Sequence, residues 1–85
     1  MILNVEERIQ FQYILPVQGN LKSLELVDSI TNKLKIKDEK ENEREFIFEI
    51  EEIQFLQDCI KILDQNNKLN FQSLSVIRKI MEEII

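Results

Sequence analysis

The sequence predicts a single, mainly α-helical domain over residues 1–85, with one short β element in its middle. Its one glycine and one proline leave few forced turns, which favours long helices over a many-stranded sheet. Four stretches carry apolar residues at helical spacing, and one alternates with the period of a strand. We therefore expect an α+β domain of four helices, with a short β-hairpin or a single strand between the second and the third. No internal repeat is evident.

The first two helices are predicted from capping residues and from the turn between them. Asn4 can cap a first helix, and Glu7 stands three residues later, where it can complete a capping box. Pro16 ends this helix because the residue before a proline avoids helical backbone angles. Gly19 can then take a left-handed turn conformation, and a second helix follows at about residues 21–34.

The middle of the chain has the clearest strand pattern. Nine consecutive polar residues, 37–45, precede the stretch Phe-Ile-Phe-Glu-Ile at residues 46–50. Alternate side chains of a strand share a face, so one face of this strand is apolar. Its backbone groups need a partner, either residues 34–37 in a hairpin or the same strand of a second chain. The predicted apolar face consists of Phe46, Phe48 and Ile50.

The last two helices have wide apolar faces. The third is expected at about residues 51–65, and Asn66-Asn67 ends it because asparagine tolerates a left-handed cap. Asn70 can cap the fourth helix. The side chains of the fourth helix that we expect to face inward are Phe71, Leu74, Ile77, Met81 and Ile84.

The end of the fourth helix holds more apolar side chains than one neighbouring element would cover. Excess apolar surface on a small domain often marks an interface. Two interpretations stay open, a homodimer seam and a fraying C-terminal end. The candidate interface residues are Ile80, Ile84 and Ile85.

The charge of the chain is concentrated in one segment. The net charge is −5, and residues 37–52 hold eight acids against three bases, so they account for all of it. Such a segment can dock on a basic protein surface, and a solvated loop is the alternative. The strand within it can add to a partner strand, or it can pack internally on the third helix. The candidate partner-binding residues are Glu39, Glu41, Glu43, Glu45, Phe46 and Phe48.

The residue types argue against catalysis and metal binding. The chain has no histidine to act as a base near neutral pH, and its single cysteine, Cys59, lies on the apolar face of the third helix. One cysteine without histidine does not make a zinc site, and the acids of residues 37–52 lack the spacing of a calcium loop. We therefore expect no enzyme, no metal and no cofactor.

Composition also limits the partners and the location. No apolar run reaches the roughly 18 residues that a membrane span needs, and the N-terminus lacks the pattern of a signal peptide. We expect a cytoplasmic protein without a membrane partner. Nucleic acid is not the expected partner because the domain is acidic, although the Gly19-Asn20 turn between two helices is compatible with a helix-turn-helix.

Two long stretches resemble small proteins encoded by tailed phages and prophages. Residues 3–34 share with them an N-terminal helix, a turn and a second amphipathic helix, and residues 55–80 are similar to their closing pair of helices. Their Trp-containing connecting segment is replaced here by the charged run and residues 46–50. The resemblance implies a phage or mobile-element context in a bacterial host cell, and it supplies no catalytic residues. The positions that carry it are Glu7-Arg8, Leu15-Pro16, Gly19-Asn20, Leu63-Asp64 and Lys68-Leu69.

The acidic segment and the lack of catalytic residues together predict a non-enzymatic protein-binding module. We expect it to be phage-encoded and to inhibit a host factor or a defence nuclease through its acidic face. Its partner would be a protein with a basic surface. A homo-oligomeric structural or assembly protein is the alternative, because of the wide apolar faces. A small DNA-binding regulator that uses the first two helices is the second alternative.

Overall fold

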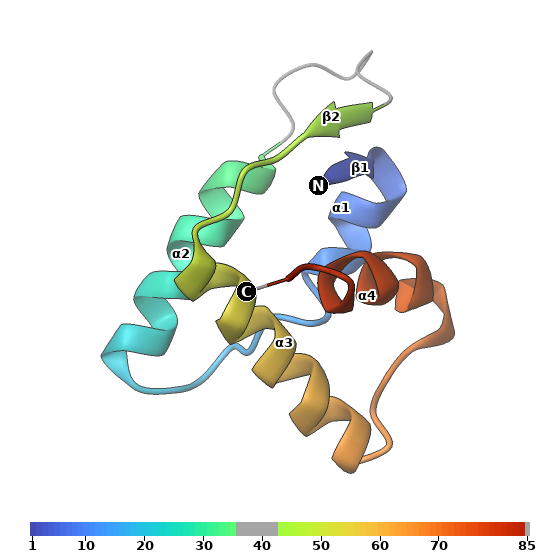
Figure 1. The fold of residues 1–85 in the computed structure, drawn as a ribbon. Helices are drawn as coiled ribbons and strands as arrows, with labels where there is room; N and C mark the ends of the chain where they lie inside the picture. The colour runs from blue at the N-terminus through green and yellow to red at the C-terminus, as the bar shows by residue number, and fades with distance from the viewer. Residues whose placement is uncertain (36–42, 85) are drawn as a thin grey trace.

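The computed structural model describes residues 1–35 and 43–84, which form four α-helices and a two-stranded antiparallel sheet. The predicted mainly α fold, with a strand between the second and third helices, is confirmed. The two strands lie together at one end of the helices (Figure 1). Within these residues, no helix is both long enough and apolar enough to cross a membrane. In chain order the elements are β1 (Ile2–Asn4), α1 (Val5–Phe11), α2 (Leu21–Leu34), β2 (Glu43–Glu45), α3 (Ile50–Gln65), a 3-10 turn (Phe71–Ser73) and α4 (Leu74–Met81).

Asparagine side chains cap α1, α2 and the 3-10 turn before α4. Asn4 Oδ1 accepts a hydrogen bond from Glu7 N–H at 2.7 Å, and Glu7 Oε1 accepts one from Asn4 N–H at 3.0 Å, which completes the capping box of α1. Asn20 caps α2 by accepting from Ser23 N–H at 2.8 Å. Asn70 caps the 3-10 turn that leads into α4. These local signals are reliable because each involves only three or four consecutive residues.

The predicted end of the first helix and the predicted conformation of Gly19 differ from the structure, whereas the predicted conformation of Asn67 is confirmed. α1 ends at Phe11, ahead of the predicted stop at Pro16, and residues 12–14 continue as turns. Gly19 does not have a positive φ, so its predicted left-handed conformation is wrong. The chain reverses over several residues between α1 and α2, and no single residue has to be left-handed. Asn67 has a φ of 55° after α3, as predicted.

β2 pairs with the N-terminal strand β1. The backbone pairing continues for one more residue pair, because Phe46 N–H donates to Met1 O at 2.8 Å and the Met1 ammonium donates to Phe46 O at 3.0 Å. The pairing therefore joins the two ends of a segment of more than 40 residues. The antiparallel partners within the strands are Ile2 and Glu45, Leu3 and Arg44, and Asn4 and Glu43.

The strand predicted at residues 46–50 is wrong in its position, and so is its hairpin with residues 34–37. The strand lies just before it, in β2, and α3 already begins at Ile50. Register explains the difference: the pairing reaches Met1, so the residues after Phe46 have no neighbour in β1. The first of the hairpin residues ends α2, and the last two lie outside the described residues.

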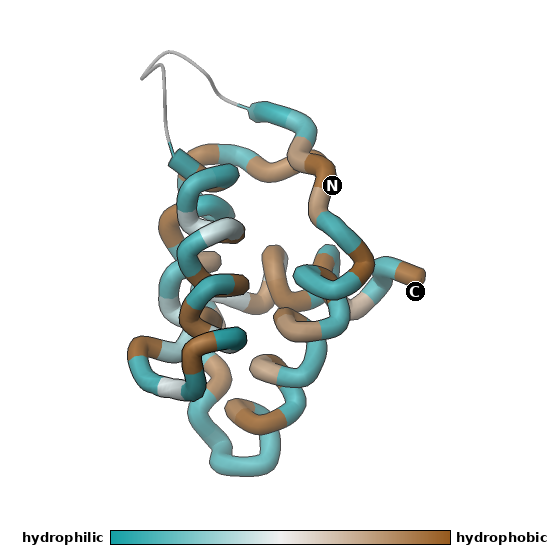
Figure 2. Tube along the Cα trace, turned by 90° about the vertical axis from the view of Figure 1, so that its left-hand side faces the viewer, coloured by the Kyte–Doolittle hydropathy of each residue, from teal (hydrophilic) through white to brown (hydrophobic). Residues whose placement is uncertain are grey.

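The core lies between the sheet and the helices, and Figure 2 shows apolar and hydrophilic stretches alternating along each helix. The predicted inward face of the fourth helix is partly wrong, because Phe71 is 84% exposed, Met81 is 41% exposed and Ile84 is 96% exposed. Phe71 lies in the 3-10 turn and Ile84 lies beyond α4, so neither follows the helical spacing. The core residues are Leu3, Phe11, Ile14, Ile30, Leu34, Phe46, Leu56, Ile60, Val76, Ile77 and Ile80.

The described residues contain the element order strand–helix–helix twice, but the two strands do not correspond, because the N-caps Asn4 and Glu49 align β1 with residues 47–49 and not with β2. Residues 1–7 (MILNVEE) and 46–52 (FIFEIEE) occupy equivalent places at the starts of α1 and α3. The two halves interlock, because α1 packs on α4 of the second half and α2 packs on α3. Met1 and Phe46, which pair with each other, each stand three residues before the N-cap of α1 or α3.

Candidate protein-binding face

The two-stranded sheet presents one face to the core and the other to solvent. Leu3 is fully buried and Phe46 is 4% exposed, whereas Ile2 is 54% exposed and Ile47 is 81% exposed. This alternation follows from the two-residue period of extended backbone. We name the outer surface the ribbon face. It consists of Ile2, Asn4, Glu43, Glu45 and Ile47.

The ribbon face combines acidic and apolar side chains. Glu43 and Glu45 are exposed on β2, and Glu45 lies across the sheet from Ile2. Ile47 continues the same side of the chain after β2. An exposed isoleucine pair beside two carboxylates can contact both the apolar and the basic side chains of another protein.

The structure divides the predicted partner-binding residues into two groups. Glu43 and Glu45 lie on the ribbon face, where a partner can reach them. Phe46 and Phe48 point inward, so they are not exposed anchors as predicted. The remaining two, Glu39 and Glu41, lie outside the described residues.

Two exposed apolar residues of the ribbon face were not among the predicted binding residues: Ile47 was expected only as part of the strand at residues 46–50, and Ile2 was missed. The signal for Ile47 was present, because the alternation that places two phenylalanines on one side places the residue between them on the other. Ile2 gave no such signal, since a three-residue strand next to a helix cap is too short to show a period. Its exposure depends on the pairing with β2.

An aromatic stack below the ribbon face explains why the phenylalanines point inward. The ring centroids of Phe46 and Phe48 are 6.2 Å apart, and those of Phe48 and Phe11 are 5.8 Å apart. The guanidinium of Arg44 lies 4.8 Å from the centroid of the Phe46 ring. Contacts of this kind add to the burial of the rings. The stack holds the chain after β2 against α1, and thereby fixes the ribbon face.

The backbone just after β2 is open. Phe46 pairs with Met1, and Glu49 N–H donates to Glu52 Oε1 at 2.8 Å. Between them, the N–H and C=O groups of Ile47 and Phe48 have no hydrogen-bond partner within the described parts of the chain. Extended backbone with free polar groups, next to an existing pair of strands, can accept a further strand.

Glu52 belongs to the acidic segment but not to its surface. It is 2% exposed, and its carboxylate accepts hydrogen bonds from Ser29 Oγ at 2.9 Å, from Glu49 N–H and from the Lys33 ammonium. Burial by itself raises the pKa of Glu52, but these hydrogen bonds and the charge of Lys33 outweigh burial and lower its pKa. Glu52 therefore joins α3 to α2.

Glu7 has equivalent surroundings in the first half. Its carboxylate accepts hydrogen bonds from Asn4 N–H, from Ser75 Oγ at 2.7 Å and from Lys79 Nζ at 2.8 Å. Lys79 also donates to Ile2 O at 2.8 Å, so α4 is tied to both α1 and β1. Burial raises the pKa of Glu7, but the hydrogen bonds outweigh burial and its pKa is lowered. We call each of these two arrangements, around Glu7 and around Glu52, a carboxylate anchor.

No family model, curated protein or solved structure matches this chain. The resemblance to small phage proteins, and the setting that it implies, therefore stay predictions. The function has to be argued from the residues and contacts of the chain itself.

The other candidate residues lie apart from the ribbon face. Ile80 is fully buried in the core, so it cannot contribute to a homodimer seam on the surface; Ile84 is exposed and Ile85 lies outside the described residues. Cys59 is half-buried on α3, and burial together with the charge of Asp58 raises its pKa. Among the described residues, no three cysteine, aspartate or glutamate side chains gather as a metal site.

The two bases of α2 are paired with acids of α3. Lys22 Nζ lies 3.1 Å from Glu51 Oε1, and the Lys33 ammonium binds the carboxylate of Glu52. A helix that reads nucleic acid usually presents its bases to the phosphates. The pairing in α2 therefore gives no support to the predicted alternative of a DNA-binding regulator.

Proposed function

We propose that this protein is a non-enzymatic protein-binding module that captures an extended, basic segment of a partner protein on its ribbon face. The observation that carries the proposal is the open backbone of Ile47 and Phe48, which continues the line of β2 beyond its pairing with β1. A partner strand added there would form main-chain hydrogen bonds, and its alternate side chains would point to the same side as the ribbon face.

The acidic side chains favour a partner segment that contains lysine or arginine. Glu43, Glu45 and Glu49 are exposed along the strand and its continuation. Their field attracts a basic segment and speeds its association, and salt weakens this attraction. Each exposed ion pair contributes only about 0–1 kcal/mol. The glutamates therefore select the partner and set the association rate, rather than supply most of the affinity.

The two exposed isoleucines supply the apolar part of the contact. Ile47 is 81% exposed, so a partner can bury most of its side chain, and Ile2 is 54% exposed. Complete burial of such a side chain is worth about 1.5–3 kcal/mol. Ile47 therefore contributes more to the affinity than any one of the glutamates.

The setting that we propose is interference with a host protein. A phage-encoded module with this face would occupy the basic surface of a host factor or of a defence nuclease, and would block the natural ligand of that surface. Two observations support this setting, the resemblance to small phage proteins and the concentration of charge in residues 37–52. It places the protein in the cytoplasm of the bacterial host.

The test is a capture experiment with charge-matched variants. Immobilised protein is exposed to bacterial lysate, and the retained proteins are identified by mass spectrometry. Glu43→Lys/Glu45→Lys changes the ribbon face, and Glu25→Lys/Asp28→Lys makes the same change of charge on exposed acids of α2. We expect a partner that the wild type and the α2 variant retain and that the ribbon variant loses. Equal retention by all three proteins would refute the proposed face.

A third variant, Ile47→Asn, tests the apolar contact without adding a positive charge. We expect it to bind the same partner about tenfold or more weakly, because the burial of the isoleucine side chain is lost. Surface plasmon resonance separates the two contributions. Ile47→Asn should raise the dissociation rate, whereas reversal of the glutamates should mainly lower the association rate.

Self-association is a second candidate function, because a different apolar surface is also exposed. Tyr13 and Ile62, which are 66% and 58% exposed, line a cavity of about 300 Å³ between the α1–α2 connection and α3. Val17 and Leu21 are 92% and 74% exposed in the same connection and at the start of α2. Apolar side chains gathered in this way are typical of an interface. Light scattering over a concentration series tests it, and a monomer mass up to the solubility limit excludes it.

A further inference from the structure

Arg8 is a buried cation that has no hydrogen-bond partner among residues 1–35 and 43–84. The residue is 2% exposed, and its three guanidinium nitrogens are all buried. The guanidinium carbon lies 5.5 Å from the centroid of the Phe46 ring. A ring face attracts the charge but fills none of the five N–H donors of a guanidinium.

An unpaired guanidinium is costly inside a protein. The group keeps its charge, and burial removes the water that would otherwise bind its N–H groups. Buried charges are therefore usually paired with an opposite charge. The two carboxylate anchors obey this rule, because Glu7 and Glu52 each bind a lysine. Arg8 departs from it in the same small core.

The matching position of the second half holds an aliphatic residue instead of a cation. Arg8 directly follows the anchor residue Glu7, and its equivalent, Ile53, directly follows Glu52. Ile53 is 7% exposed and belongs to the buried apolar residues. An aliphatic side chain therefore fills the position of α3 that matches Arg8 in the alignment of the two capping boxes.

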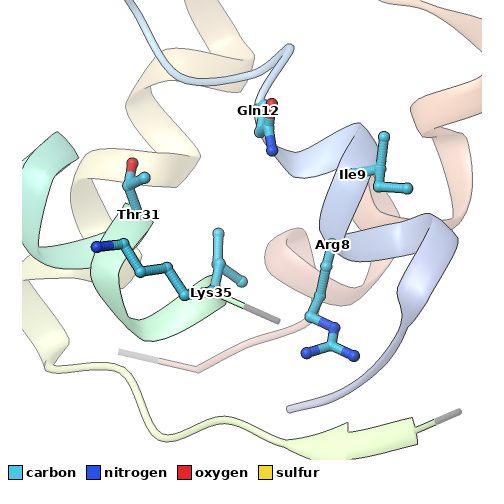
Figure 3. Close-up of a pocket in the computed structure, with 6 residues that line it drawn as sticks. Arg8, Ile9, Gln12, Thr31 and Lys35 are labelled. Carbon is cyan, nitrogen blue, oxygen red and sulfur yellow. The ribbon is translucent and has the colours of Figure 1, made fainter. Parts of the chain in front are cut away.

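A cavity lies beside Arg8, between α1 and the C-terminal turn of α2. Its volume is about 200 Å³, far above the roughly 10–15 Å³ that one water molecule needs. Gln12 and Thr31 line it with neutral polar groups, and Lys35 lines it with a second cation. Figure 3 shows Arg8 extending from α1 toward the chain segment of β2, while the Lys35 ammonium points away from Arg8. The remaining lining residues are Ile9 and Leu34.

The charges around this cavity favour an anion. Arg8 and Lys35 each contribute a full positive charge. The C-terminal end of α2 opposes them with only about half of a negative charge from its dipole. The planar fork of a guanidinium matches a ligand group with two or more acceptor oxygens. Gln12 and Thr31 can donate further hydrogen bonds.

We propose that Arg8 anchors a binding site for a small oxyanion, the phosphate or carboxylate group of a low-molecular-weight ligand. The guanidinium nitrogens are closed to solvent as they stand, so the ligand enters the cavity between α1 and α2, the Arg8 side chain turns toward it, and the ligand then accepts two hydrogen bonds from the guanidinium. Lys35 is exposed, so its side chain can turn toward the bound anion. The site is separate from the ribbon face, and its existence does not depend on the proposed protein partner.

Thermal unfolding with added anions tests the site. The melting temperature of the full chain is measured against inorganic phosphate in one series and acetate in another, with sodium chloride keeping the ionic strength constant. We expect at least one of the two anions to raise the melting temperature of the wild type, and the increase should level off as the anion concentration rises. Phosphate and acetate distinguish a tetrahedral from a planar ligand group. A wild type that responds to neither would overturn the proposal.

The matched variant is Arg8→Ile, which copies the residue at the equivalent position 53. This variant should fold, and its melting temperature should not rise to a plateau with the anion that stabilises the wild type. Arg8→Lys keeps the charge but loses the fork, and we expect it to bind the anion about tenfold more weakly. Unchanged responses in Arg8→Lys and in any folded Arg8→Ile would place the anion elsewhere and overturn the proposal.

A final variant distinguishes an external ligand from the carboxylates of the chain itself. Asp38→Asn/Glu39→Gln/Glu41→Gln removes the acids of the segment that lies outside the described residues. If Arg8 serves an external anion, this variant should respond to that anion as the wild type does. If only this variant responded, an internal carboxylate would be the counter-charge of Arg8, and the proposed ligand site would be rejected.

Discussion

Glu7 and Glu52 show how a buried carboxylate can be kept charged at the start of a helix. Each accepts a hydrogen bond from the backbone N–H three residues before it, and each binds a serine and a lysine of a neighbouring helix. The serine and lysine are four residues apart in both cases, so they share one helix face. Burial without these donors would raise the pKa of the glutamates instead of lowering it.

Removing one anchor should cost more stability than removing a neighbouring surface pair. We expect Glu52→Gln to lower the free energy of unfolding by about 2–4 kcal/mol, because it leaves the partly buried Lys33 without its counter-charge. Glu51→Gln is the control, since the pair of Glu51 with Lys22 is exposed, and it should change stability by less than about 0.5 kcal/mol. Urea unfolding measures both. Equal losses would show that the anchor contributes no more than a surface pair.

The same two glutamates should make the protein sensitive to acid. Their pKa values are lowered in the folded state from the usual 4.5, so the unfolded chain binds more protons in acid. Their contribution is complete above about pH 4.5, and it is lost as the pH falls through the lowered pKa values. Melting temperatures between pH 7 and pH 2.5 check this. Glu7→Gln/Glu52→Gln should flatten the decline, and an unchanged decline would assign it to other carboxylates.

The contacts of some single residues could be predicted from the sequence, and those of others could not. Asn4 with Glu7 was predictable as a capping box, because the two residues are close in the chain. The lysine and serine that complete the anchor come from α4, more than 65 residues away, and no local pattern reveals them. The burial of Arg8 was unpredictable for the same reason, since a lone arginine in a helix is usually a surface residue.

At the scale of elements, β1 is short but belongs to the core. Its central residue, Leu3, is fully buried, and its first residue pairs across the sheet with β2. A two-stranded ribbon is marginal alone, and here the aromatic stack and Lys79 fasten it to the helices. These contacts hold the two strands that carry the ribbon face in place against the helices.

Neighbouring residues of β1 should respond very differently to truncation. Leu3→Ala leaves a cavity in the core, and we expect it to lower the free energy of unfolding by about 2–5 kcal/mol. Ile2→Ala removes a side chain that is 54% exposed, and it should cost less than about 1 kcal/mol. Chemical denaturation compares the two. Similar values would mean that β1 is not docked on the core in solution.

The helices were predicted more accurately than the strand for a physical reason. The start of α2 follows from its cap and that of α3 from apolar spacing, and both signals are local. The strand position depends on a partner at the other end of a long segment, and the alternation at residues 46–50 is equally consistent with an unpaired extended chain. The charge of the ribbon face and the exposure of Ile47 were therefore predictable, whereas the exposure of Ile2 was not.

At the scale of the whole molecule, the two halves depend on each other. α1 packs on α4, α2 packs on α3, and each carboxylate anchor joins a helix of one half to a helix of the other. Neither half has its own core, because the buried apolar residues form one cluster. Folding should therefore be a single cooperative step.

This interlocking predicts how separated halves behave. We expect a peptide of residues 1–42 and a peptide of residues 43–85 to be largely unfolded alone, since α1 loses its packing on α4 in the first peptide, and α3 keeps α4 but loses α2 in the second. Mixing them at equal concentration should restore helical content, which circular dichroism measures. A half that is fully helical by itself, with no gain on mixing, would contradict the interlocked arrangement.

The pairing of Met1 with Phe46 also has a practical consequence for protein engineering. The Met1 ammonium donates to Phe46 O, so a peptide fused ahead of Met1 would leave the sheet alongside Ile47 and Phe48. An affinity tag at this end would thus act as a tethered competitor at a high local concentration. Fusions used to search for partners should therefore be made at the C-terminus, where the tag cannot cover the open backbone of Ile47 and Phe48.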